Sequence, residues 1–222
     1  MSPDLVIFDC DGVLVDSEGL AALAMQAVLR EGGIAVPLAA IGRCVGMKQA
    51  DIIASLEAET GAVVGPLLAD RLWPATRALF AERLTATRGL VEFLDRLPHR
   101  RCVASSSSHE RIAFSLALTG LQRFFMPDAV FSSSEVARGK PAPDLFLHAA
   151  SRMGVAPGRC VVIEDSRFGV QGAIAAGMTA LGFVGGSHAN DDTRAALLAN
   201  GAVAVEATWA AVAERLGVAL VA

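Results

Sequence analysis

Short apolar runs alternate with helical patterns along most of this chain of 222 residues. The runs lie at 4–9, 101–105, 129–131, 160–164 and 178–184. Such runs are typical of strands buried on both faces, as in a parallel sheet. Helical patterns lie between them, for example at 89–97, 109–119 and 143–153. The alternation predicts an α/β fold with a doubly wound parallel sheet, whose ligands bind at the carboxyl ends of the strands.

Residues 17–87 break this alternation, because they carry helical patterns only. The predicted helices lie at 18–31, 47–60 and 66–85. Pro74 is expected to kink or split the last of them. An all-helical insert after the first strand indicates a second, smaller domain. We therefore predict a core of residues 1–16 and 88–222 with a helical domain of residues 17–87.

The composition excludes several classes of protein. Hydrophobic residues make up 53% of the chain, which is enough to bury a full core and excludes global disorder. A formal net charge of −4 argues against nucleic acid as a partner. The longest stretch without charged residues, 168–190, contains six glycines. It is therefore typical of helix, turn, strand and loop rather than of a membrane span.

The cysteines and the N-terminus bear on location. None of the four cysteines forms a CxxC pair, which favours reduced core thiols. No basic segment precedes the apolar run at 4–9, as a secretory signal would require. We therefore expect a cytoplasmic protein. Little in the sequence concerns assembly, and we expect a monomer or a weak homodimer.

Carboxylates follow two of the predicted strands. Asp9 and Asp11 lie two residues apart, and residue types of this kind hold Mg²⁺ or divide nucleophilic and acid–base work. A plain turn is the alternative. Glu164 and Asp165 are adjacent, and they repel each other unless a cation is near. An exposed turn with a helix cap is the alternative there.

Two further segments suit an anion. Lys140 precedes two prolines, which stiffen the loop and start the next helix, and a fixed ammonium suits a phosphate or an aspartyl nucleophile. An ordinary solvated lysine is the alternative. The serines at 105–108 follow a strand, and hydroxyls with successive loop amides form an anion cradle. A helix N-cap is the alternative for one of them.

Together these four segments strongly resemble the motifs of the haloacid dehalogenase superfamily, in its phosphatase branch. The matching segments, in order, are DCDGVLVDSE, VASSSS, GKPAPDLF and VVIEDSRFGV. The details resemble most the β-phosphoglucomutase-like subfamily. The resemblance implies a Rossmann-like core with an inserted helical cap of the C1 type.

The resemblance also implies roles for the motif residues. Asp9 would be the nucleophile that forms an aspartyl phosphate. Asp11 would protonate the leaving oxygen and then activate water. Dehalogenases do not need the protonation step, because a halide leaves without a proton. Ser105 and Lys140 would hold the phosphoryl oxygens. The other phosphate-binding candidates are Ser106 and Ser107. The Mg²⁺ ligands would be Asp9, Glu164, Asp165 and the backbone carbonyl of Asp11.

Residues 42–51 match the cap's specificity loop of that subfamily. The candidate substrate contacts there are Arg43, Gly46, Lys48 and Gln49. For Arg43 and Lys48, solvated surface charge is the alternative. Mutases carry an arginine where this chain has Gln49, and a histidine and a tryptophan where it has Ala21 and Met25. These departures favour hydrolysis over phosphoryl isomerisation.

We therefore expect a Mg²⁺-dependent phosphatase that acts on a small phosphorylated metabolite, a sugar or sugar-acid phosphate. A β-phosphoglucomutase-type mutase is the first alternative. A non-catalytic module that binds Mg²⁺ and a phospho-ligand, or a receiver-like domain, is the second. A receiver would lack the helical insert and would not need Asp11. Neither nucleic acid nor a membrane is an expected partner.

Overall fold

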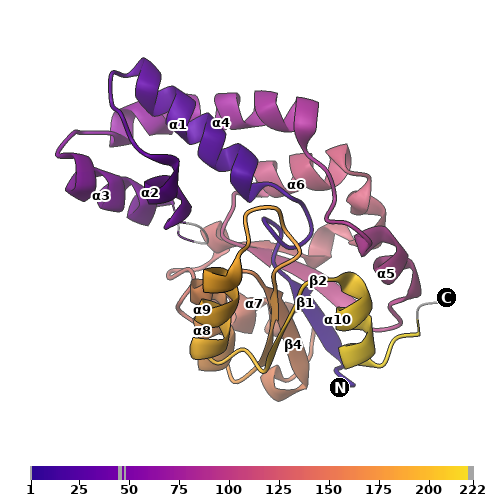
Figure 1. Cartoon of the computed structure of the whole chain (residues 1–222). Coiled ribbons are helices and arrows are strands. Elements are labelled where there is room, and N and C mark those ends of the chain that lie inside the picture. The colour runs from indigo at the N-terminus through magenta and orange to yellow at the C-terminus, as the bar shows by residue number, and fades with distance from the viewer. Residues whose placement is uncertain (1, 45–46, 48, 220–222) are drawn as a thin grey trace.

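A six-stranded parallel sheet forms the core of the computed structural model, which describes residues 2–44, 47 and 49–219 (Figure 1). The strands are β1 (Leu5–Phe8), β2 (Arg100–Ser105), β3 (Val130–Ser132), β4 (Cys160–Glu164), β5 (Thr179–Phe183) and β6 (Ala204–Glu206). Their order is β3-β2-β1-β4-β5-β6, and each neighbouring pair is parallel. The chain leaves β1 in one direction and returns to its other side at β4. This arrangement confirms the predicted doubly wound sheet, and it puts a ligand crevice beside β1.

Helices cover both faces of the sheet. They are α5 (Leu90–Arg96), α6 (His109–Leu118), α7 (Asp144–Arg152), α8 (Arg167–Ala175), α9 (Asp191–Ala199) and α10 (Trp209–Leu216). Short 3-10 turns lie at Leu121–Phe124, Pro127–Ala129, Ser133–Glu135 and Pro157–Arg159. Val6 and Phe8 pack with α5, α6 and α10, whereas Leu5 and Ile7 pack with α7, α8 and α9. Burial of both faces explains why β1 is apolar at every position.

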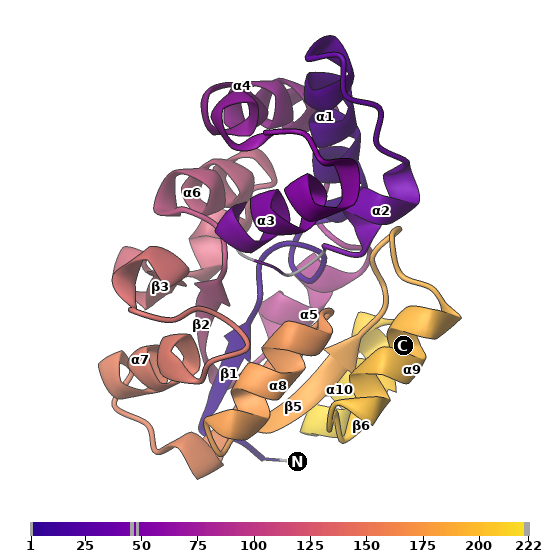
Figure 2. The same ribbon diagram turned by 90° about the vertical axis from the view of Figure 1, so that its left-hand side faces the viewer.

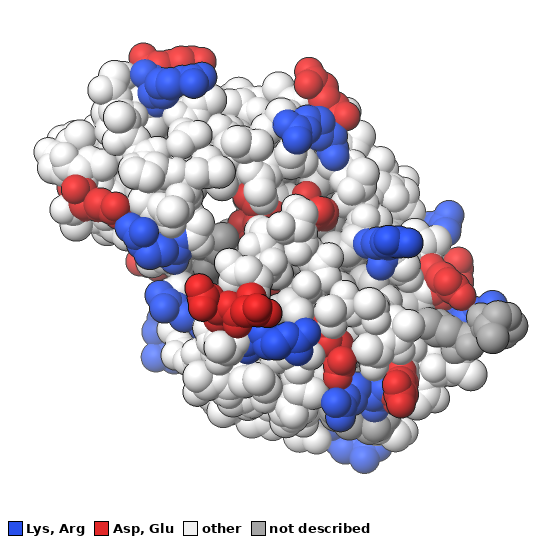
Figure 3. Space-filling view, in the orientation of Figure 1, with Lys and Arg blue, Asp and Glu red and all other residues white. Residues whose placement is uncertain are grey.

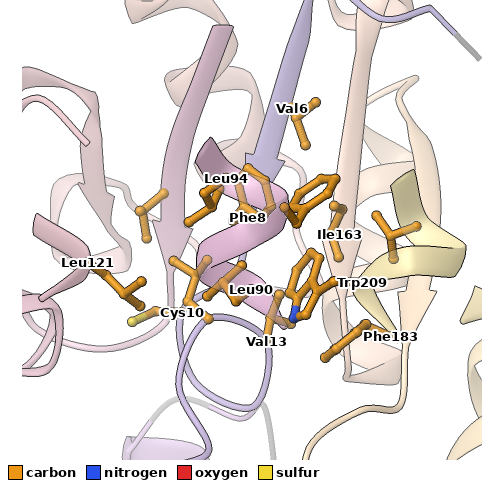
Figure 4. Packing of buried hydrophobic residues seen from close by; sticks show 14 of the residues in the cluster. Val6, Phe8, Cys10, Val13, Leu90, Leu94, Leu121, Ile163, Phe183 and Trp209 are labelled. Atoms are coloured by element: carbon orange, nitrogen blue, oxygen red, sulfur yellow. The ribbon is translucent and has the colours of Figure 1, made fainter. Parts of the chain in front are cut away.

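Trp209 links the core to the loop that follows β1. Its ring lies 5.0 Å from that of Phe93 and 4.5 Å from that of Phe183, in the cluster shown in Figure 4. Its Nε1 donates to Thr87 Oγ1 at 2.9 Å, and Thr87 Oγ1 donates to the carbonyl of Val13 at 2.7 Å. Packing and two buried hydrogen bonds thus fix the segment that carries Asp11.

Helices form a separate layer above one end of the sheet (Figures 1 and 2). They are α1 (Glu18–Glu31), α2 (Leu38–Gly42), α3 (Gln49–Thr60) and α4 (Gly65–Arg83). They bury an apolar cluster of their own, which includes Leu29, Leu56 and Leu68. The two connections to the core lie side by side, since Asp16 N donates to Thr85 O at 2.9 Å. This layer is called the cap below, and its exact domain boundaries stay a prediction.

Pro74 does not split the predicted helix, because α4 is one helix with Pro74 inside it, and the alternative of a kink stays a prediction. The proline removes one backbone hydrogen bond, and packing of α4 along α1 and against α6 offsets that loss. The short helix α2 and the three-residue strand β6 were not predicted. Among the described residues, no helix combines the length and the apolar character that a membrane crossing needs.

Candidate active site

A cavity of about 230 Å³ lies between the cap and the carboxyl ends of the strands. Figure 3 shows the surface hollowed between these layers, with acidic residues at the hollow. The core side of the cavity is polar. Its lining residues from the predicted set are Asp9, Asp11, Ser105, Ser106, Ser107 and Lys140. The structure therefore brings together the core residues that the motifs singled out.

Asp9 and Lys140 form a buried ion pair at the end of β1. Lys140 Nζ lies 2.6 Å from Asp9 Oδ1 and 2.5 Å from Glu164 Oε1. Burial alone would favour the neutral amine, but the two carboxylates raise the pKa of Lys140. Lys140 is therefore an ammonium fixed beside Asp9, 131 positions away in the sequence.

Three buried carboxylates meet beside this ammonium. Oxygens of Asp9, Glu164 and Asp165 lie within 4.8 Å of one another. Burial raises the pKa of Asp9 well above its usual value and also raises the pKa of Glu164. The positive charge of Lys140 lowers both pKa values but does not cancel the effect of burial. Asp165 Oδ2 is buried and lies 3.0 Å from His188 Nε2. One ammonium cannot balance three carboxylates, and this all-oxygen donor set fits Mg²⁺.

Asp11 has a different environment from Asp9. It accepts hydrogen bonds from Ser17 Oγ at 2.7 Å, Ser107 Oγ at 2.6 Å and Arg111 Nη2 at 2.6 Å. Burial opposes its ionisation, but Arg111 and the two hydroxyls hold its pKa below the usual value. The side chain of Asp11 lies outside the three-carboxylate cluster, so its predicted metal contact through the backbone carbonyl stays a prediction.

Hydrogen bonds fix the serine loop at residues 105–108, where β2 ends. Ser105 Oγ accepts from the backbone N–H of Ser107 at 3.1 Å. Two hydroxyls at the end of β3 donate to the loop's carbonyls: Ser132 Oγ to Ser107 O at 2.7 Å and Ser133 Oγ to Ser106 O at 2.9 Å. These contacts preorganise the loop next to Asp11. The N-cap of α6 is a fourth serine, Ser108.

A sequence profile of haloacid dehalogenase-like hydrolases matches residues 3–177. The chain belongs to this family. The 6-phosphogluconate phosphatase of Escherichia coli is 33% identical over 187 residues, which are 83% of this chain and 84% of that protein. The fructose-1-phosphate phosphatase YqaB of Escherichia coli is 36% identical over 179 residues, 79% of this chain and 94% of that one.

A solved structure agrees with this assignment. A HAD family hydrolase of Deinococcus radiodurans with bound phosphate and sodium has a TM-score of 0.78 and 34% identity, and the match covers 98% of this chain and 96% of that chain. The resemblance drawn from the four motifs is thereby confirmed. This protein is an enzyme, a HAD-type hydrolase with phosphatase relatives.

The cap candidates behave differently from the core residues of this hydrolase. Arg43 does not line the cavity, because its exposed guanidinium pairs with Glu59 of α3 at 2.9 Å. Its interpretation as surface charge is therefore the better one. Gly46 and Lys48 lie outside the described residues. Gln49 begins α3, and its predicted substrate contact stays a prediction.

Three charged residues at the site were missed by the sequence analysis. Arg111 and Glu18 line the cavity, and burial raises the pKa of Glu18 to about 8. His188 Nε2 lies 3.0 Å from Asp165 Oδ2. Glu18 ends the quoted segment DCDGVLVDSE, but no role was assigned to it. Arg111 sits within an ordinary helical pattern and His188 has no ligand spacing, so only the folded chain brings these two to the motifs.

Gly12 is required for the position of Asp165. Its φ is +76°, and a Cβ there would lie 1.8 Å from Asp165 Oδ2. We expect Gly12→Ala to lose about 1–2 kcal/mol for the left-handed backbone, and more because Asp165 must move. Gly154→Ala is the matched control, since its φ is +65° with nothing within 4 Å. Thermal melts check the difference, and equal losses would contradict this packing argument.

Proposed function

We propose that this hydrolase removes the phosphoryl group from a small sugar or sugar-acid phosphate, with Mg²⁺ bound, through an aspartyl phosphate at Asp9. The observation that carries the proposal is the pair of carboxylates on one cavity wall, Asp9 held by Lys140 and Asp11 held by hydroxyls and a guanidinium. The relatives named for 6-phosphogluconate and fructose 1-phosphate support the substrate class. The cavity of about 230 Å³ also suits a small substrate.

In the first step, an Asp9 carboxylate oxygen attacks the phosphorus atom. The bond between phosphorus and the ester oxygen breaks, and that oxygen takes a proton from Asp11 as the alcohol leaves. Ser105 and the ammonium of Lys140 hold the non-bridging oxygens, on which negative charge is spread. Separate hydrogen-bond partners, Lys140 for Asp9 and Arg111 for Asp11, hold the two carboxyl groups in different positions at the cavity.

In the second step, a water molecule attacks the phosphorus atom of the aspartyl phosphate. Asp11 accepts the proton of this water. The bond between phosphorus and the Asp9 oxygen breaks, which releases inorganic phosphate and restores the Asp9 carboxylate. Asp11 is then protonated again, ready for the next ester.

The three-carboxylate cluster would hold the metal. Asp9, Glu164 and Asp165 supply side-chain oxygens, and Asp11 its backbone carbonyl. When bound, Mg²⁺ supplies charge neutralisation at the transferring phosphoryl group. The convergence of three buried carboxylates within 4.8 Å of one another supports this assignment.

Phosphate release from a panel of sugar and sugar-acid phosphates, with Mg²⁺ present, tests the proposed function. We expect hydrolysis of a monophosphate to exceed conversion of β-glucose 1-phosphate to glucose 6-phosphate, even with a bisphosphate primer. Ala21 and Met25 line the cavity without a polar group that could grip a second phosphate. Efficient isomerisation would favour the mutase instead, and binding without turnover would favour a non-catalytic module.

Replacing Asp11 by asparagine should lower turnover about 10²- to 10⁴-fold, the usual contribution of a positioned acid–base group. The loss should shrink for aryl phosphates, because their leaving groups need little protonation. Phosphate release from para-nitrophenyl phosphate and a sugar phosphate checks this. The control is Asp144→Asn, which removes a surface partner of Arg138. Equal losses on both substrates would contradict the acid role.

The cysteines support a proposal on location. Cys10, Cys44, Cys102 and Cys160 are buried with free thiols. Protein thiols persist in reducing compartments. We therefore propose that the enzyme works in the cytoplasm.

A further inference from the structure

Arg111 joins the two halves of the cavity. It lies on α6 of the core, and its guanidinium carbon is 5.1 Å from the centre of the Phe80 ring on α4 of the cap. Its side chain is 21% exposed and lines the cavity, with Nη2 at 2.6 Å from Asp11 Oδ1. The aromatic face and the carboxylate fix the plane of the guanidinium.

The contact with Asp11 determines which part of the substrate Arg111 faces. In the proposed mechanism Asp11 faces the leaving oxygen, so a group bound to Asp11 lies beside the organic part of the substrate. Lys140 lies at the phosphoryl end of the substrate, where it already pairs with Asp9 and Glu164. Among the lining residues that the structure describes, Arg111 is the cation at the leaving-group end.

Arg111 also has unused binding capacity. A guanidinium carries five N–H donors, and the hydrogen bond to Asp11 uses one of them, on Nη2. The nearby cap lining is largely apolar, with Met25, Leu72 and Trp73 among its residues. A charge-assisted hydrogen bond is stronger in such surroundings than in water.

We propose that Arg111 binds a carboxylate on the organic part of the substrate, so that this enzyme prefers phosphorylated sugar acids to neutral sugar phosphates. This inference rests on the proposed function and deepens it. The planar guanidinium matches a carboxylate through two parallel hydrogen bonds. Burial raises the pKa of Glu18 to about 8, which weakens its competition with a substrate carboxylate for Arg111.

Two substrates that differ in one group test the inference. 6-Phosphogluconate carries a carboxylate where sorbitol 6-phosphate carries a hydroxymethyl group. We expect the wild type to prefer the acid at least about 10-fold in kcat/KM. Arg111→Gln should reduce this preference about 10- to 100-fold, chiefly through KM for the acid. Arg111→Lys keeps the positive charge but loses the planar pair of donors, so it should retain part of the preference.

The ratio of the two substrates separates recognition from other effects of the substitution. Any loss from disturbing Asp11 or the fold affects both substrates and cancels in the ratio. The matched control is Arg77→Gln, because Arg77 lies over the Phe114 ring between cap and core but outside the cavity lining. This variant should keep the wild-type preference.

Two outcomes would overturn the inference while the proposed function stands. One is a wild type whose kcat/KM for sorbitol 6-phosphate equals its kcat/KM for 6-phosphogluconate. The other is an Arg111→Gln variant that loses activity equally on both, which would mean that Arg111 serves Asp11 alone. A wild type that releases phosphate from no phosphate ester would instead overturn the proposed function, and this inference with it.

Discussion

Replacing Asp9 by asparagine is expected to abolish turnover of every phosphate ester and to leave the fold intact. An amide oxygen cannot form the acyl phosphate, so the covalent route disappears. The loss should be at least about 10⁴-fold, which corresponds to several kcal/mol of transition-state stabilisation. Lys140 keeps its second partner, Glu164, and the amide has almost the shape of the carboxylate. Phosphate release and a thermal melt measure the two expectations.

Asp4→Asn is a suitable control for this experiment. Asp4 lies on the surface just before β1 and pairs with Arg159, far from the cavity lining. This change should leave turnover unaltered. Near wild-type hydrolysis by the Asp9→Asn enzyme would rule out the covalent assignment, whatever the control does.

The core of the site could be predicted from sequence because of how parallel strands meet. Asp9, Ser105 and Glu164 each lie at or just past the end of a strand, and those strands, β1, β2 and β4, are neighbours in the sheet. A run that is apolar at every position identifies such a strand without any knowledge of its partners. Side chains at the ends of these runs are then brought to one edge by topology alone.

The residues that were missed depend on tertiary contacts. Arg111 reaches Asp11 across 100 positions, from a helix whose pattern is ordinary. His188 comes to Asp165 in a loop held by Ser187, whose N–H and hydroxyl both donate to Asp16 Oδ1 at 2.9 Å. No spacing rule reports such contacts. The sequence could therefore indicate the chemistry at the phosphoryl group better than the contacts around its leaving group.

The cap illustrates the same limit. Helical periodicity located α1, α3 and α4, because each buries an apolar face in the cap's own cluster. It did not show which side chains turn toward the cavity. Arg43 was a candidate by its place in the loop, yet Glu59 on α3 holds its guanidinium at the surface.

Removal of Mg²⁺ is expected to reduce phosphate release to background, and added Mg²⁺ should restore it. Ca²⁺ should not substitute, because its looser coordination does not fix the phosphoryl oxygens. Lys140 pairs with Asp9 and Glu164, and Asp165 lies beside His188, so three carboxylates converge at one point where a divalent cation would balance their charge. Activity in excess EDTA, before and after addition of each metal, is the direct measurement. Full turnover in EDTA would refute the metal assignment.

Variants of the cluster test the same assignment without relying on activity. A ligand at about 100 times its dissociation constant stabilises the folded state by about 2.7 kcal/mol, so Mg²⁺ should raise the melting temperature of the wild type. It should raise that of Asp165→Asn much less, because this change removes one charged oxygen ligand from the three-carboxylate cluster. Asp128→Asn, at an exposed aspartate, should respond like the wild type.

Glu164 should respond more weakly than Asp165. Lys140 and Ser166 already donate to its two oxygens, which leaves it fewer lone pairs for a metal. Glu164→Gln should therefore keep part of the Mg²⁺-dependent rise in melting temperature. If Glu164→Gln lost the whole Mg²⁺-dependent rise while Asp165→Asn kept it, Glu164 would be the stronger metal ligand and this prediction would be wrong.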